Sequence, residues 1–356
     1  MAQVAPFCAV RYDERRAGPL DRLIAPPYDV ISPEERVRYL DRSPYNVVHL
    51  TLPEDEAEAG RLWRDWRAES VLARDDEAAV WWLAQDYVGP DGVPRTRTGL
   101  VAAVRAEAYS ERIILPHERT HAGPKEGRLR LLRELRAHIE PIFLLADVEL
   151  TGPPGPPDVG VELEGVTNRL WRLPEAPPSS FAAAQLLIAD GHHRYETALA
   201  FHAEDGSEAS AWLLAAIVPT RQEGLTIFPT HRLVQRLGNA GGEQVASVEE
   251  GLAALPEGRA AAVVYRGGRA LVVEGEAGQL DAALVERLGA EGVTYTPRVE
   301  EAVAAVDSGA AEAALLLRPP TIENVRAIAE RGETMPQKST YFYPKLVSGL
   351  LFLSLD

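Results

Sequence analysis

An apolar strand near the middle of the chain runs directly into a glycine turn and a helix. Residues 185–189 read QLLIA, and the segment DGHHRYETALA follows without a break. An apolar run of this length without alternation is typical of a strand buried on both faces. The run WLLAAIV at residues 212–218 has the same character. The order strand, turn, helix, strand predicts a fold in the α/β or mixed α+β class.

The turn between the strand and its helix has the chemistry of an anion site. A helix N-terminus presents unpaired backbone N–H groups and the positive end of the helix dipole. Gly191 lets the backbone approach a ligand closely, and His192, His193 and Arg194 add donors that suit a phosphate chain. Asp190 supplies the hard oxygen that phosphate-bound Mg²⁺ prefers, which makes it a candidate catalytic and metal-binding residue. The alternative is that Asp190 only caps the helix and the histidines only fill its first turn.

A second segment, LPHERTH, contains the pattern H-E-x-x-H of zinc proteases. In that pattern His117 and His121 bind zinc from one face of a long helix. Pro124 follows at once, and a proline inside a helix removes a backbone donor. We therefore expect a loop that presents Glu118 to a pocket as a candidate base. A zinc-dependent hydrolase that uses both histidines is the lesser alternative.

Weaker candidates lie outside these two motifs. Arg128 stands at the start of a helix predicted over residues 129–138, where it could contact phosphate, although arginines there are also typical of a solvated helix face. Polar groups in proline-rich or apolar surroundings are typical of site loops, and turn chemistry explains them nearly as well. On this basis the possible substrate-binding residues are Tyr28, Asp29, Lys338, Ser339 and Thr340.

The rest of the chain alternates between helical and strand patterns. Ser32 followed by proline is a good N-cap and predicts a helix over residues 33–41. The β-branched content of NVVHLTL predicts a strand at residues 46–52. The predicted parts are an N-terminal α/β domain (1–108), a core that carries both motifs (109–236), a C-terminal α/β domain (237–332) and a segment that packs back on the body (333–356).

Composition disfavours several classes of protein. Lys and Arg total 37 against 53 Asp and Glu, and the net charge of −16 disfavours a nucleic-acid partner. The longest apolar runs fall far short of the ~18 residues that cross a bilayer, so we expect no membrane partner. The single cysteine, Cys8, excludes an intrachain disulfide framework and a thiolate zinc cluster. The first residues lack a secretory pattern, and we expect a cytoplasmic protein.

The order of the motifs resembles a known superfamily. ILPHERT, the helix LRLLRELRAH, the strand PIFLL and LLIADGHHRYETALA occur in the order found in ParB/sulfiredoxin-like proteins. With APPYDVIS near the start and MPQKSTYFYPKL near the end, the chain resembles the bacterial domain of unknown function 1015 family over nearly its whole length. It departs from compact superfamily members in the longer, proline-rich stretch between Glu118 and Asp190. His192 stands where the sulfinic acid reductases have a cysteine, and no helix-turn-helix module of the DNA-segregation proteins is evident.

The resemblance implies a ParB/sulfiredoxin-like nucleotide-binding core with flanking α/β domains. Similarity to free serine kinases implies a kinase that phosphorylates a small hydroxyl metabolite, first of all free L-serine, with ATP or ADP and Mg²⁺ as cofactors. It implies that Glu118 is the base and that the phosphates and the metal lie at Asp190, His192, His193 and Arg194, while His117 and Arg128 are further candidates for phosphate binding. The alternative is a nucleotide-binding sensor without transfer activity.

Overall fold

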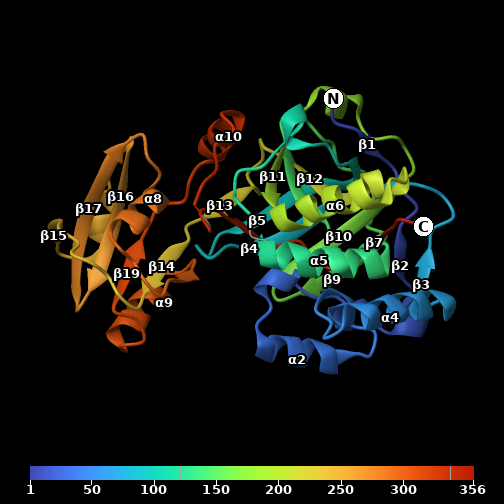
Figure 1. The fold of residues 1–356 in the computed structure, drawn as a ribbon, viewed down its shortest axis with the longest axis horizontal. Helices are drawn as coiled ribbons and strands as arrows, with labels where there is room; N and C mark the ends of the chain where they lie inside the picture. The colour runs from blue at the N-terminus through green and yellow to red at the C-terminus, as the bar shows by residue number, and fades with distance from the viewer. Residues whose placement is uncertain (121, 337) are drawn as a thin grey trace. The chain divides into compact units, whose positions relative to one another are not determined.

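The computed structural model describes residues 1–120, 122–336 and 338–356, and the chain forms two compact units (Figure 1). Unit 1 consists of Met1–Leu225 and Pro344–Asp356, and unit 2 consists of Thr226–Tyr343. Both units combine helices with a sheet, which confirms the mixed α/β class. Unit 1 contains residues on both sides of the boundary expected at residue 108. A separate N-terminal domain over residues 1–108 stays a prediction.

Unit 1 is built on a nine-stranded sheet with the order β6-β11-β8-β12-β5-β4-β10-β9, and β1 pairs with β5. β11 lies between β6, to which it is parallel, and β8, to which it is antiparallel. β8 in turn is parallel to β12. The strands are β1 (Val4–Ala5), β4 (Val80–Val88), β5 (Pro94–Arg105), β6 (Ile114–Leu115), β8 (Ile142–Ala146), β9 (Val159–Leu163), β10 (Val166–Leu173), β11 (Leu186–Asp190) and β12 (Trp212–Pro219).

Two long helices, α5 (Ala122–Leu135) and α6 (His192–Asp205), lie side by side over this sheet (Figure 1). Tyr195 and Ala198 of α6 are buried in one apolar cluster with Ile188 and other residues of the sheet. α5 packs on α4 (Glu56–Ala68), where Trp63 shares a second cluster with residues of α5. The sheet and both helices therefore fix the turn between β11 and α6 from several sides.

Helix α2 (Pro33–Arg42) confirms the helix expected after Ser32, because Ser32 and Glu35 form a reciprocal capping box. The smaller elements of unit 1 are α1 (Glu14–Ala17), β2 (Val10–Tyr12), β3 (Leu72–Arg74), β7 (Ala137–His138) and β21 (Leu353–Ser354). β21 pairs with β7, and Phe352 beside it is fully buried. The last residues of the chain are thus part of the body of unit 1.

The strand expected at residues 46–52 is wrong, because this segment forms the short helix α3 (Val48–Thr51). Asn46 is fully buried, its Oδ1 accepts a hydrogen bond from the Val48 amide (3.0 Å), and its Nδ2 donates to the Arg22 carbonyl (2.8 Å). An asparagine that satisfies buried backbone groups favours a tight turn over a strand. Tertiary contacts here outweigh the strand preference of β-branched residues.

Unit 2 contains a six-stranded sheet with the order β15-β17-β16-β19-β14-β18 and a separate pair, β13 with β20. Its strands are β13 (Thr226–Phe228), β14 (His231–Val234), β15 (Glu243–Val245), β16 (Arg259–Arg266), β17 (Arg269–Ala277), β18 (Thr294–Thr296), β19 (Ala313–Leu316) and β20 (Tyr341–Tyr343). Its helices are α7 (Val248–Ala253), α8 (Asp281–Arg287), α9 (Val299–Asp307) and α10 (Ile322–Glu330). Among the described residues of both units, no helix is long and apolar enough to cross a membrane.

Candidate anion-binding site at the start of helix α6

The turn that leads into α6 depends on Gly191. β11 ends at Asp190, and Gly191 adopts a left-handed conformation (φ 94°, ψ 27°) before the helix begins at His192. A Cβ at this position would lie 3.1 Å from the Arg194 guanidinium, so an L side chain would be both strained and crowded. Glycine therefore lets Arg194 fold back over the turn.

Two cations converge on the carboxylate of Asp190. Lys345 Nζ lies 2.6 Å from Oδ1, and Arg194 Nη2 lies 3.0 Å from Oδ2. Burial alone would raise the pKa of Asp190, but the charges of Lys345 and Arg194 outweigh burial and hold this pKa far below its usual range. Lys345 was not among the residues singled out in the sequence. It belongs to the C-terminal segment MPQKSTYFYPKL, whose resemblance to the family was the one available signal.

Arg194, whose side chain is 11% exposed, has a second fixed contact. Its Nη1 donates to the Pro141 carbonyl at 2.6 Å. Burial by itself would lower its pKa, but the nearby charges of Glu140, Asp190 and Asp29 raise it. The guanidinium is thus held cationic at the first turn of α6.

A third cation, Arg97 of β5, lies close enough to Asp190 for their charges to interact. Its side chain is 1% exposed, its Nε donates to Gln85 Oε1 (3.1 Å), and its Nη2 donates to the Pro344 carbonyl (2.6 Å). Its guanidinium stacks 4.5 Å above the centroid of the Phe143 ring. Burial lowers the pKa of Arg97 to about 10, while the charge of Asp190 opposes this shift. Nη1 is buried and has no hydrogen-bond partner among the described residues.

The N-terminal turn joins this cluster through Glu140. The Tyr28 amide donates to Glu140 Oε1 (3.0 Å), and Ser348 Oγ donates to the same oxygen (3.0 Å). Arg128 of α5 lies 3.8 Å above the Tyr28 ring centroid and 3.7 Å from Glu140 Oε2. Burial raises the pKa of Tyr28, while the charges of Arg194 and Arg128 oppose this shift and that of Asp29 adds to it. Segments far apart in the sequence therefore meet here, and the sequence analysis did not identify Glu140 or Ser348.

The loop that carries Glu118 lies against the first turn of α6. The His117 amide donates to His192 Nε2 (3.2 Å), and the two rings meet edge to face with centroids 4.6 Å apart. His117 Nδ1 lies 2.7 Å from the Ile188 carbonyl, which can only accept, so this nitrogen carries the proton. Burial lowers the pKa of His117 to about 4 and that of His192 well below its usual range. Both rings are therefore neutral.

The burial of these rings bears on the roles expected for the two histidines. His117 is fully buried and His192 nearly so, and both rings are used inside the protein. These contacts hold the loop against the first turn of α6, and the phosphate contacts expected of His117 and His192 stay predictions. His193 is half-buried on the same turn.

A second pair of contacts fixes the far end of this loop. Thr120 Oγ1 and Lys125 Nζ each lie 2.7 Å from Glu196 Oε2 of α6. Glu118, which is half-buried, follows His117 directly and is therefore one residue from the contact with His192. The structure thus brings the two motifs together, as the sequence predicts.

The sequence offers two metals, Mg²⁺ at Asp190 and, as the lesser alternative, zinc at His117 and His121. His121 lies outside the described residues, so the zinc alternative stays a prediction. No group of three or more His, Cys, Asp or Glu residues that could hold a metal occurs in the described part of the chain. Both oxygens of Asp190 accept from cations, so this carboxylate does not fit Mg²⁺ as it stands.

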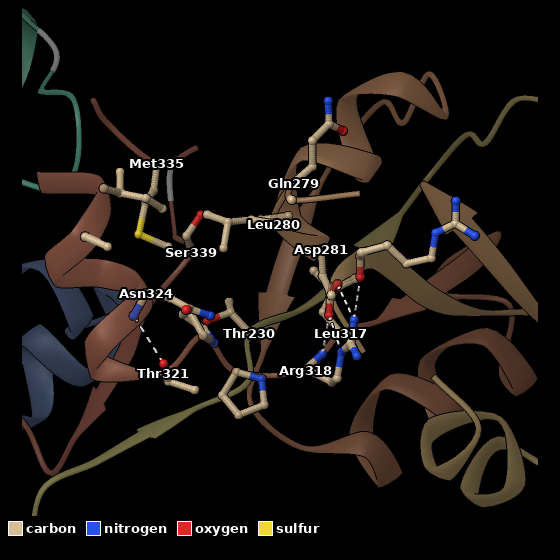
Figure 2. A pocket seen from close by; sticks show the side chains of 18 of the residues that line it. Thr230, Gln279, Leu280, Asp281, Leu317, Arg318, Thr321, Asn324, Met335 and Ser339 are labelled. Carbon is tan, nitrogen blue, oxygen red and sulfur yellow. Dashed lines mark hydrogen bonds and ion pairs between the residues drawn. The ribbon is translucent and has the colours of Figure 1, made fainter. Parts of the chain in front are cut away.

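The other possible substrate residues belong to unit 2. Lys338 is exposed, and its carbonyl accepts a hydrogen bond from Arg232 (3.1 Å). Ser339 is buried and lines a cavity of about 540 Å³, while Thr340 is half-buried. Figure 2 shows Ser339 on one side of this cavity, with the ion pair of Asp281 and Arg318 on the other. Tyr28 and Asp29, by contrast, lie in the cluster around Arg194.

The search of curated proteins found no match. The search of solved structures found similar chains at low sequence identity. A conserved hypothetical protein from Pyrococcus furiosus is 16% identical, with a TM-score of 0.40, over 68% of this chain and 92% of that chain. A variant of a free serine kinase in complex with AMP is 16% identical, with a TM-score of 0.41, over 65% of this chain and 84% of that chain. SbnI from Staphylococcus aureus, with a C-terminal truncation, is 12% identical, with a TM-score of 0.39, over 70% and 85%.

The family comparison covers most of the chain. Residues 4–294 match the model of the family described as protein of unknown function (DUF1015). This match spans the N-terminal turn, the loop with Glu118 and the turn at Asp190, on which the resemblance in the sequence rests. The chain belongs to this family, DUF1015.

Proposed function

We propose that unit 1 binds the phosphates of a nucleotide at residues 190–194 and transfers a phosphoryl group to a small hydroxyl compound. The observation that carries this proposal is the contact between the loop of Glu118 and the first turn of α6, made by His117 with His192. This contact supports the proposal because Glu118 is the next residue after His117 and a helix N-terminus is the kind of group that binds phosphate. Free L-serine is the first acceptor to test, because the motifs resemble those of free serine kinases.

The charge of the cluster supports an anionic ligand. The cations Arg97, Arg128, Arg194 and Lys345 outnumber the carboxylates Asp190, Glu140 and Asp29 by one, although the whole chain carries a net charge of −16. A local excess of positive charge in a buried site attracts anions and stabilises charge that develops in phosphoryl transfer. The 14-residue α6 adds the backbone amides of its first turn and the positive end of its dipole.

The division of labour follows from this arrangement. The amides at the start of α6, together with Arg194 and Lys345, hold the phosphates of ATP or ADP. Glu118 accepts the proton of the acceptor hydroxyl as its oxygen forms the new bond to phosphorus. The bond from that phosphorus to the bridging oxygen of the nucleotide breaks, and the shortened nucleotide leaves with the electron pair.

The substitution Glu118→Gln tests this proposal. We expect it to lower the rate of phosphoserine formation from ATP or ADP by about 100-fold or more, as loss of a general base does. Nucleotide affinity, measured by isothermal titration, should stay within about twofold. Glu126→Gln is the matched control, because Glu126 is exposed on α5 and pairs there with Arg130 at 3.8 Å. A Glu118→Gln protein that turns over serine as fast as the parent contradicts the assignment of the base.

One observation favours a second function, nucleotide sensing without transfer. Phosphoryl transfer usually relies on Mg²⁺ at the phosphates, and Asp190 does not fit this metal while Lys345 and Arg194 occupy its oxygens. A nucleotide sensor needs only binding. A nucleotide that raises the melting temperature, without being consumed in the presence of any small hydroxyl acceptor, would favour this second function.

A further inference from the structure

We infer that Asp190 holds Lys345 and Arg194 at the phosphate site through ion pairs while no ligand is bound. When a phosphate chain binds, both cations turn from Asp190 to the phosphate oxygens, so binding needs no divalent cation. This inference rests on the proposed phosphate site and names how its charge is neutralised.

The first step concerns the cost of burying cations. Lys345 and Asp190 each expose only 17% of their side chains, and Arg194 exposes 11%. A buried cation without a counter-charge is strongly destabilising, so a ligand-free protein needs an anion to hold these groups in place. Asp190 is that anion, with contacts of 2.6 Å to Lys345 and 3.0 Å to Arg194.

The cations around Asp190 exceed the carboxylates by one: Arg97, Arg128, Arg194 and Lys345 face Asp190, Glu140 and Asp29. Arg97 is buried and lies close enough for Asp190 to act on its pKa. Arg97 Nη1 is buried and lacks a hydrogen-bond partner among residues 1–120, 122–336 and 338–356. Buried donors without a partner are rare in native proteins and point to a missing acceptor. The local excess of charge and donors matches a group with several anionic oxygens, such as a pyrophosphate chain.

The backbone around Lys345 is held by hydrogen bonds to other parts of unit 1. The Pro344 carbonyl accepts from Arg97 (2.6 Å), and the Ser348 amide donates to the Ala25 carbonyl (2.9 Å). Ser348 Oγ also contacts Glu140. The backbone on both sides of Lys345 is therefore fixed to unit 1, and only its side chain has to turn from Asp190 to a ligand.

The substitution Asp190→Asn separates this role from that of a metal ligand, because the two predict opposite signs. We would titrate inorganic pyrophosphate into the full chain by isothermal calorimetry, once with EDTA and once with Mg²⁺. If Asp190 holds the cations, Asp190→Asn should tighten binding in EDTA by about fivefold, because a competing like charge is removed. If Asp190 were a metal ligand, the variant would bind more weakly in Mg²⁺.

Lys345→Met provides an independent arm, in case Asp190→Asn does not fold. It should weaken pyrophosphate binding in EDTA by about 10-fold, the usual effect of losing one charged hydrogen bond. The double variant should lose the gain of Asp190→Asn. Glu204→Gln and Arg133→Met are matched controls for the charge changes, because these residues form an exposed pair on α6 and α5 (2.7 Å) and should leave affinity unchanged.

The outcomes of these titrations distinguish failure of the inference from failure of the proposed phosphate site. Pyrophosphate binding in EDTA that weakens on Lys345→Met supports the inference. Binding by the parent that requires Mg²⁺, or binding that Lys345→Met leaves unchanged, overturns the inference while the proposed phosphate site stands. A parent that binds pyrophosphate under neither condition overturns both.

Discussion

Acidification should loosen unit 1 through the buried ring of His117. The pKa of this histidine falls from 6.5 to about 4 because burial disfavours the charged ring. Below pH 6.5 His117 takes up a proton in the unfolded chain, whereas in the folded chain it stays neutral down to about pH 4. The unfolded state therefore binds more protons in this range, and the protein becomes less stable as the pH falls. Between pH 7.5 and pH 5 this linkage costs about 2 kcal/mol for His117 alone.

Urea unfolding followed by tryptophan fluorescence measures this cost. All 6 tryptophans lie in unit 1, so their emission reports on this unit. His117→Gln keeps a donor for the Ile188 carbonyl and removes the titrating ring. The free energy of unfolding of the variant should therefore drop about 2 kcal/mol less than that of the parent between the two pH values. An equal drop in both proteins would contradict a lowered pKa of His117 and hence its burial as a neutral ring.

Three further substitutions test other parts of the structure. Gly191→Ala should cost about 1–2 kcal/mol in urea unfolding and also weaken pyrophosphate binding, whereas Gly18→Ala, with φ 93° and open space around it, should cost similar stability and leave binding intact. Gly224→Ala should destabilise unit 1 severely because its Cβ would lie 1.9 Å from the Thr96 carbonyl oxygen. The control is Gly160→Ala, whose Cβ would meet nothing within 4 Å. Equal midpoints of urea unfolding in the two variants would refute this packing. Asp281→Asn should speed hydrogen exchange in β16 and α8, because Asp281 accepts from the Ala261 amide (2.8 Å) and Arg318 (2.8 Å); the exposed pair of Arg259 and Glu274 offers Glu274→Gln as a control that should leave exchange unchanged.

Local patterns in the sequence predicted much of the fold around the site. The capping residues of α2, the apolar strand β11 and the glycine before α6 lie where expected, because each depends on neighbouring residues. Residues 46–52 were misread as a strand because the buried contacts of Asn46 reach back to Arg22. No pattern within the segment reveals such a contact.

The composition of the site itself depends on contacts between distant residues. Lys345 and Asp190 are 155 positions apart, and Ser348 and Glu140 are 208 positions apart. Spacing along the chain cannot indicate that these residues meet, so the sequence revealed Asp190 and Arg194 but not Lys345, Glu140 or Ser348. The burial of His117 was also hidden, since a histidine in a proline-flanked loop is typical of an exposed group.

A crystal structure of the full chain with ADP tests the central claim most directly. The account predicts that the terminal phosphate lies within about 3 Å of backbone amides in the first turn of α6, that Lys345 and Arg194 have turned towards its oxygens, and that the Glu118 carboxylate lies beside it. ADP bound elsewhere, with the contacts of Asp190 to Lys345 and Arg194 unchanged, would contradict the account.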